Sequence, residues 1–167
     1  PSSPNTLTSW SIGHSSLQPA DVVVLKKFCN VFGYSFSDSF ASTHLIAGVN
    51  GRMQTKRTLK YLDAIVCGKW VLSMDWVKQS LQEMKIVPED GFEIIGDDKF
   101  YNNIPRSCRS LGGVSFPNME IFFYGEFGQP ARESLISLAC KLKCQIVSDI
   151  EELKSKRSGK HIVVICD

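Results

Sequence analysis

Groups suited to binding an anion occur near two predicted helix starts. Ser15 and Ser16 precede one helix, whose free N–H groups and dipole favour a negative charge. Thr58 and Lys60 open another helix. Two hydroxyls, an N–H and an ammonium can together satisfy a phosphate dianion, at roughly 1.5–3 kcal/mol for each charge-assisted bond. These residue types therefore favour phosphate binding.

Each of these residues also has a plain structural interpretation. Serines such as Ser15 and Ser16 commonly cap the first turn of a helix. A lysine such as Lys60 most often lies in solvent, and Arg57 could belong to the same solvated cationic turn. From the residues alone, capping is the commoner role for the two serines.

The composition is that of a globular protein. The chain has 167 residues, of which 43% are hydrophobic, a length that suits one domain or two small ones. Its 19 basic and 17 acidic residues give a net charge of +2, which is too balanced to predict nucleic-acid binding by bulk electrostatics. We find no signal peptide and no apolar run long enough to span a bilayer, and expect no membrane partner.

The sequence shows no catalytic or cofactor signature. It has no P-loop, dinucleotide fingerprint or catalytic triad, and its six cysteines lack zinc-type spacing. Cys29, Cys67 and Cys140 lie within apolar runs, where reduced cysteine behaves as a small hydrophobe, and this favours a reducing compartment. Cys140 and Cys144, four apart on a predicted helix, lack a fourth metal ligand even with His161. His44 and His161 both lead strands, so we expect hydrogen-bonded structural roles near the core.

Hydrophobic periodicity predicts an α/β order for residues 8–98. The predicted elements are a strand at 8–12, a helix from Pro19 to about Gly33, strands at 34–36 and 43–47, a helix from Leu59 that Gly68 stops, a strand at 70–72, a helix around Trp76 and an edge strand at 92–95. Strands alternating with helices imply a parallel sheet with helices on both faces. We expect Trp70, Trp76 and the Phe122-Phe123 pair to lie in the core.

The second part of the chain repeats the order of the first. After a predicted linker at 99–117, the unit at 118–167 gives a strand at 120–124, a helix started by Pro130, a strand at 144–147 and a strand at 161–165. This unit stops before any counterpart of Lys56–Leu81. We therefore expect one face of its sheet to be poorly covered.

At this point the chain resembles the BRCT family. The resemblance is carried by Thr43-His44 before the central strand, Gly68-Lys69-Trp70 before the fourth strand, and Trp76 in the last helix. It covers residues 10–98 well and 112–167 more loosely. The implied fold is α/β, with two BRCT-like repeats, each a small parallel sheet flanked by helices, and the second repeat incomplete.

Paired domains of this family bind phosphoserine peptides, so the resemblance implies a set of contact residues. The phosphate contacts it implies are Ser15, the N–H of Ser16, Thr58 and Lys60. Arg57 matches an arginine that contacts the peptide backbone. Leu62 matches one wall of a cleft between the repeats, which holds an aromatic side chain three residues after the phosphoserine. The family usually has glycine where Ser16 stands.

The resemblance implies a phosphoserine-peptide or chromatin-reading module of a nuclear DNA-damage-response and repair protein. The expected partner is a phosphorylated protein or histone peptide, and a RING ubiquitin ligase heterodimer would form through regions outside this chain. We expect DNA binding to be weak at most. Two alternatives stay open: a structural protein-protein interaction module without phosphate recognition, and binding of DNA ends or poly(ADP-ribose), to which the basic run 154–160 could contribute.

Overall fold

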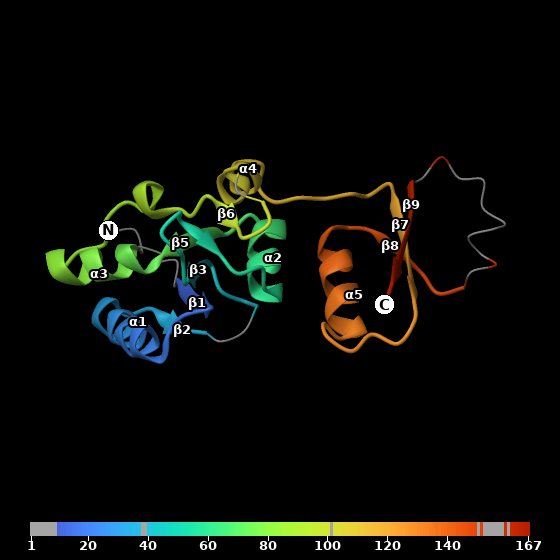
Figure 1. Ribbon diagram of the computed structural model, residues 1–167. Coiled ribbons are helices and arrows are strands. Elements are labelled where there is room, and N and C mark those ends of the chain that lie inside the picture. The colour runs from blue at the N-terminus through green and yellow to red at the C-terminus, as the bar shows by residue number, and fades with distance from the viewer. Residues whose placement is uncertain (1–9, 38–39, 101, 150, 152–158, 160) are drawn as a thin grey trace, which may run out of the picture.

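The first repeat is a four-stranded parallel sheet with helices on both faces (Figure 1). The computed structural model describes all residues except 1–9, 38–39, 101, 150, 152–158 and 160. The elements up to the second repeat are β1 (Ser11–Ser15), α1 (Pro19–Phe32), β2 (Ser35–Phe36), β3 (His44–Ala47), β4 (Gln54–Thr55), α2 (Leu59–Val66), β5 (Trp70–Ser73), α3 (Met74–Glu83), the 3-10 turn η1 (Glu89–Phe92), β6 (Gly96–Asp97) and α4 (Ile104–Ser110). The order and type of the predicted helices and main strands are confirmed.

Alternation along the strands divides the core between the two faces of this sheet. The strands lie in the order β2-β1-β3-β5, and all four residues of the interior strand β3 are buried. Ile46 faces the cluster formed with α1 and α3, where Phe28 and Trp76 are fully buried. Its neighbours Leu45 and Ala47 face α2. A strand buried on both faces reads as a continuous apolar run, which explains why β3 was recognisable from sequence.

Gly68 ends the second helix, as predicted, and its lack of a side chain leaves room for the linker to pass. It has a φ of 63°, in the left-handed region that glycine adopts without strain. A Cβ at this position would lie only 2.5 Å from the backbone nitrogen of Gly113. The chain leaving α4 therefore passes close to the end of α2, and a side chain at Gly68 would push it away.

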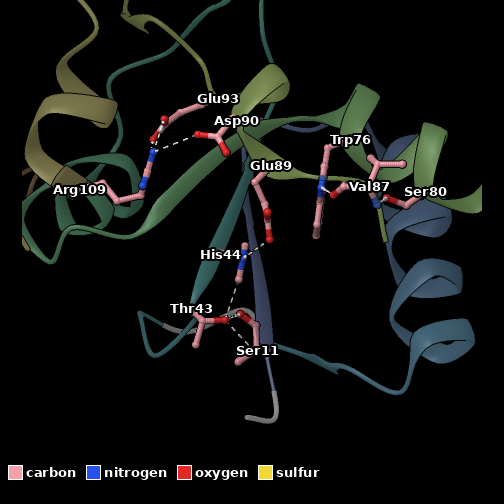
Figure 2. A network of polar contacts seen from close by, with 10 residues as sticks. All are labelled: Ser11, Thr43, His44, Trp76, Ser80, Val87, Glu89, Asp90, Glu93 and Arg109. Atoms are coloured by element: carbon pink, nitrogen blue, oxygen red, sulfur yellow. Dashed lines mark hydrogen bonds and ion pairs between the residues drawn. The ribbon is translucent and has the colours of Figure 1, made fainter. Parts of the chain in front are cut away.

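The edge strand predicted at 92–95 is wrong, and the predicted linker contains a helix. Residues Glu89–Phe92 form the turn η1, and only an isolated bridge joins Leu72 to Glu93. The Glu93 side chain is 1% exposed and accepts hydrogen bonds from Arg109 Nε and Nη2, both at 2.9 Å (Figure 2). Arg106 Nε donates to the same carboxylate at 3.2 Å. These pairs dock α4 on the first repeat.

The second repeat reproduces the first part of the fold. Its elements are β7 (Met119–Tyr124), α5 (Arg132–Lys141), β8 (Gln145–Val147) and β9 (His161–Cys166). The parallel strands lie in the order β8-β7-β9, which matches β2-β1-β3. Helix α5 covers one face of this sheet, where it packs against Ile121 and Phe123 of β7 (Figure 1). On β9, Ile162 is 44% and Val164 51% exposed, in line with the expected poor cover.

His44 is a structural residue, whereas His161 is not the buried residue that we expected. Thr43 Oγ1 donates to the Ser11 carbonyl at 3.0 Å and lies 2.9 Å from His44 Nδ1 (Figure 2). Because that hydroxyl proton is already used, His44 Nδ1–H donates to Thr43. The imidazole stacks on Trp76 with an interplanar angle of 4°. His161 lies exposed at the start of β9.

Burial lowers the pKa of His44 to about 4 and outweighs the attraction of the Glu89 carboxylate 3.8 Å away. Unfolded, the imidazole regains a pKa near 6.5, so the unfolded chain binds the extra proton between these values. The stability that depends on His44 being neutral is therefore fully present above pH 6.5 and is lost as the pH falls toward 4. We expect this histidine to remove about 2 kcal/mol of unfolding free energy between pH 7.5 and 5. Urea unfolding should show a shallower pH dependence for His44→Phe, and an equal slope would contradict this account.

Replacing Glu93 by glutamine should loosen α4. The neutral amide keeps the shape but loses the charge that both arginines share, so we expect Glu93→Gln to reduce the unfolding free energy by about 1–3 kcal/mol. The matched control is Glu83→Gln on the outer end of α3, which should change it by less than about 0.5 kcal/mol. Equal urea midpoints for the two variants would show that the buried pair does not hold the linker.

Candidate functional site

Two predicted phosphate contacts meet at the carboxyl edge of the first sheet. Ser15 is the last residue of β1, and Thr58 is the N-cap of α2. Their side-chain oxygens lie 2.7 Å apart, although 43 positions separate them in the chain. The Ser15 side chain is 5% exposed. Two hydroxyls from separate elements are thus held beside each other at one point.

The turn after β1 is held by a close backbone approach. The Gly48 N–H donates to the Ser15 carbonyl at 2.9 Å, and a Cβ at Gly48 would overlap the carbonyl oxygen of Ser16. Only glycine fits at position 48. Ser16 itself has a φ of 58°, in the left-handed region that residues with a Cβ rarely adopt. This backbone explains why glycine is the usual residue there in the family that the sequence resembles.

Thr58 has a capping role in addition to its contact with Ser15. Its Oγ1 accepts from the Tyr61 N–H at 3.2 Å, which satisfies one free donor of the first turn of α2. Lys60 lies two residues beyond this cap, in the same turn, and the residue is partly exposed. The cap fixes the position of the Thr58 hydroxyl, and the first turn brings Lys60 close to it along the chain.

The placement of Ser15 and Ser16 at a helix start needs correction. Helix α1 begins at Pro19, and its N-cap is Gln18, which makes no side-chain capping bond. The two serines end the strand and form the turn, so the capping interpretation is wrong for them. The predicted helix start at Pro19, a residue favoured in the first helical turn, is confirmed, and the serines lie too far before it to cap it.

Arg57 is held in place by a carboxylate. Its Nε and Nη2 donate to the two oxygens of Asp97 at 3.1 and 2.9 Å, and its guanidinium lies 4.8 Å from the Phe100 ring centroid. The hydrogen bond that Arg57 donates to Asp97 raises the pKa of Arg57. Burial raises the pKa of Asp97, but hydrogen bonds from Arg57 and two backbone N–H groups outweigh burial and lower it overall. Arg57 remains 34% exposed.

Leu62 lines a groove between the two repeats. The groove has a volume of about 650 Å³. One wall comes from the start of α2 and the other from the turn before α5; the lining residues are Arg57, Thr58, Leu59, Leu62, Gly128, Gln129, Pro130 and Ala131. Thr58 lines this groove and also carries one of the two paired hydroxyls.

A buried carboxylate joins the two repeats beside this groove. Asp63 of α2 has a side chain that is 4% exposed, and it forms ion pairs with Lys69 at 2.8 Å and with Lys141 of α5. Helices α2 and α5 face each other across the boundary (Figure 1). Because Asp63 holds a lysine from each side, it fixes how α5 lies against the first repeat. Local sequence carried no signal for a pair 78 residues apart.

Other candidate groups stay apart. No cluster of three or more His, Cys, Asp or Glu side chains suited to a metal occurs in the described residues. Cys144 lies beyond the end of α5, so the prediction of one helix carrying both Cys140 and Cys144 is wrong. Among the residues that the structure describes, no helix is long and apolar enough to cross a membrane. The basic run 154–160 lies outside the described residues except for Gly159.

Known proteins share this sequence pattern. Residues 24–81 match the family model described as BRCA1 C Terminus (BRCT) domain. Over 155 residues the chain is 28% identical to the breast cancer type 1 susceptibility protein homolog of Mus musculus, covering 90% of this chain and 8% of that protein. Over 151 residues it is 27% identical to the BRCA1-associated RING domain protein 1 of Arabidopsis thaliana, covering 87% of this chain and 21% of that protein. The chain thus spans a small part of each relative.

Solved structures share the arrangement of both repeats. The BRCT5-BRCT6 domains of S. pombe Brc1 superpose with a TM-score of 0.66 at 19% identity, covering 94% of this chain and 76% of that one. The complex of Rtt107p with a phosphorylated histone gives a TM-score of 0.54 at 11% identity, covering 95% and 83%. At these identities the likeness establishes the fold. Residues 24–81 therefore belong to a BRCT domain, and the chain as a whole has the fold of a tandem BRCT pair.

Proposed function

We propose that this chain binds a phosphorylated serine of a partner protein, with the phosphate held by the first repeat. The observation that carries the proposal is the 2.7 Å separation of the Ser15 and Thr58 hydroxyl oxygens. When phosphate binds, the hydrogen bond between the two hydroxyls is exchanged for bonds that both donate to phosphate oxygens. The Ser16 N–H donates as well, while the Lys60 ammonium balances the charge. BRCT domains are binding modules rather than enzymes, and we assign no catalytic residue.

The structure supports these roles through positioning. Ser15 is fixed by the sheet, Thr58 by its cap, and Ser16 by the approach to Gly48. Rigid donors lose little conformational entropy on binding, so more of each bond's free energy contributes to affinity. With charge-assisted bonds near 1.5–3 kcal/mol each, such a set can discriminate a phosphoserine from a serine by roughly a hundredfold or more.

The wider setting is also a proposal. A phosphorylated protein or histone peptide fits the site, and the Rtt107p neighbour was solved in complex with a phosphorylated histone. The relatives by sequence suggest a nuclear protein of the DNA-damage response. Any part in a RING ubiquitin ligase complex would depend on regions outside these residues.

A second candidate function is protein assembly without phosphate recognition. The apolar side chains of Ile162 and Val164 on β9 are about half exposed, which suits contact with another protein surface. In this alternative the Ser15–Thr58 bond would only join β1 to α2. Phosphate dependence of binding separates the two functions.

The first test compares a phosphoserine peptide with its unphosphorylated twin by calorimetry. We expect at least about a hundredfold difference in Kd, because the unphosphorylated serine offers no charge to the donors. A twin with glutamate at the same position should stay weak, since one planar carboxylate cannot engage all four groups. Equal affinities for the phosphorylated and unphosphorylated peptides would refute the proposal.

Removing the Lys60 charge should weaken phosphopeptide binding without unfolding the repeat. For Lys60→Met we expect a loss of about tenfold or more in affinity. The matched control is Lys85→Met: the Lys85 side chain is 69% exposed and pairs with Glu83, the last residue of α3. Wild-type affinity in Lys60→Met would favour the assembly function.

The two roles of Thr58 can be separated by one substitution. Aspartate caps helices as well as threonine does, but its charge repels a phosphate. We therefore expect Thr58→Asp to keep the unfolding free energy within about 1 kcal/mol of wild type and to lose phosphopeptide binding by more than about tenfold. The control Thr58→Ser retains both the cap and the hydroxyl, and should bind normally. Normal binding by Thr58→Asp would exclude this hydroxyl from the phosphate site.

A further inference from the structure

A second hollow borders the proposed phosphate site and shares no lining residue with the groove between the repeats. Its volume is about 600 Å³. It lies where the turn after β1, the loop after β3 and the start of α3 meet, at the carboxyl edge of the sheet. Ser16 and Lys56 line this hollow, and Thr58 lines the groove. The proposed phosphate site therefore lies between two concave surfaces.

The hollow carries excess negative charge. Its charged lining residues are Asp21, Asp75, Asp98, Lys56 and Lys78. Lys78 Nζ lies 3.4 Å from Asp21 Oδ1, so these two charges offset each other. Asp75 and Asp98 are exposed, and neither forms an ion pair with a described residue. Asp98 also acts electrostatically on Arg57, whose guanidinium is already paired with Asp97.

The wall also contains an unsatisfied buried hydroxyl. Thr55 lines the hollow and is 2% exposed, and its Oγ1 has no hydrogen-bond partner among the described residues. An unpaired buried polar group costs free energy that a polar ligand group reaching the wall would recover. The nearby loop is already ordered, since Asn50 Oδ1 accepts from the N–H groups of Arg52 and Gln54 at 2.9 and 3.1 Å. The hollow is therefore a shaped surface with an unmet polar group.

Carboxylates this close to an anion site repel a phosphate unless the ligand also brings positive charge. A peptide that places its phosphoserine between the two hollows must leave the site on both sides, and three extended residues span about 10 Å. We infer that the acidic hollow selects peptides with an arginine or lysine within about three residues of the phosphoserine, on the flank that does not enter the groove between the repeats. This inference rests on the proposed phosphoserine site.

The inference is tested with peptides that carry phosphoserine at the centre and one arginine three residues before it or three residues after it. Reference peptides have glutamine at the same position, which keeps length and polarity without charge. We expect arginine on one flank only to tighten binding by about three- to fivefold, the range of an exposed ion pair. The variant Asp75→Asn/Asp98→Asn should abolish this gain and leave the affinity for the glutamine peptides unchanged or slightly improved.

The matched control is Asp90→Asn, which removes a carboxylate that is 75% exposed and does not line the hollow. This variant should keep the arginine gain. Equal affinity for arginine and glutamine peptides, or a gain that survives in the double variant, would overturn the inference and leave phosphoserine binding intact. If instead the glutamine peptides bind equally with and without phosphate, the proposed function fails, and this inference fails with it.

Discussion

The candidate site depends on the register of one parallel sheet. Ser15, Ala47 and Ser73 are aligned as the last residues of β1, β3 and β5. In a parallel sheet all strands end at the same edge, so the turns that follow them converge there. The Gly48 N–H bond to Ser15 then draws two of these turns together. Without this alignment, nothing would hold the side chains of Ser15 and Thr58 beside each other.

Buried carboxylates place the segments that the sheet alone does not order. Asp97 holds Arg57, Glu93 holds the arginines of α4, and Asp63 holds lysines from both repeats. Desolvation of such carboxylates offsets much of the attraction, so these pairs contribute more to placement than to net stability. The apolar clusters stabilise each sheet, while the paired charges decide how the linker and the second repeat lie against it.

Local periodicity was sufficient for the parts of the fold that are regular within one segment. The helices α1 and α2 and the buried strand β3 each bury an apolar face or run that is visible in the sequence. Helix α4 was missed because its seven residues, IPRSCRS, have no apolar period and are held by Arg109 and Arg106 on Glu93. Residues 92–95 looked like a strand because they are mostly apolar, although they form one bridge only. For the site, the resemblance to the BRCT family predicted the residues. The Ser15–Thr58 contact and the Arg57–Asp97 ion pair join residues far apart in the chain, so only the structure reveals them.

The proposed phosphate recognition and the proposed flank selection have separate physical origins in this chain. Every proposed phosphate contact belongs to the first repeat, whose sheet and caps position them without help from the second. The groove that Leu62 lines exists only while α5 lies against α2, and that arrangement depends on the pairing of Asp63 with Lys141. The acidic hollow, by contrast, is built from the same repeat as the phosphate site. Under the proposed function, a change at the boundary between repeats therefore alters which peptides are chosen on one flank, while binding of the phosphate itself and selection on the other flank persist.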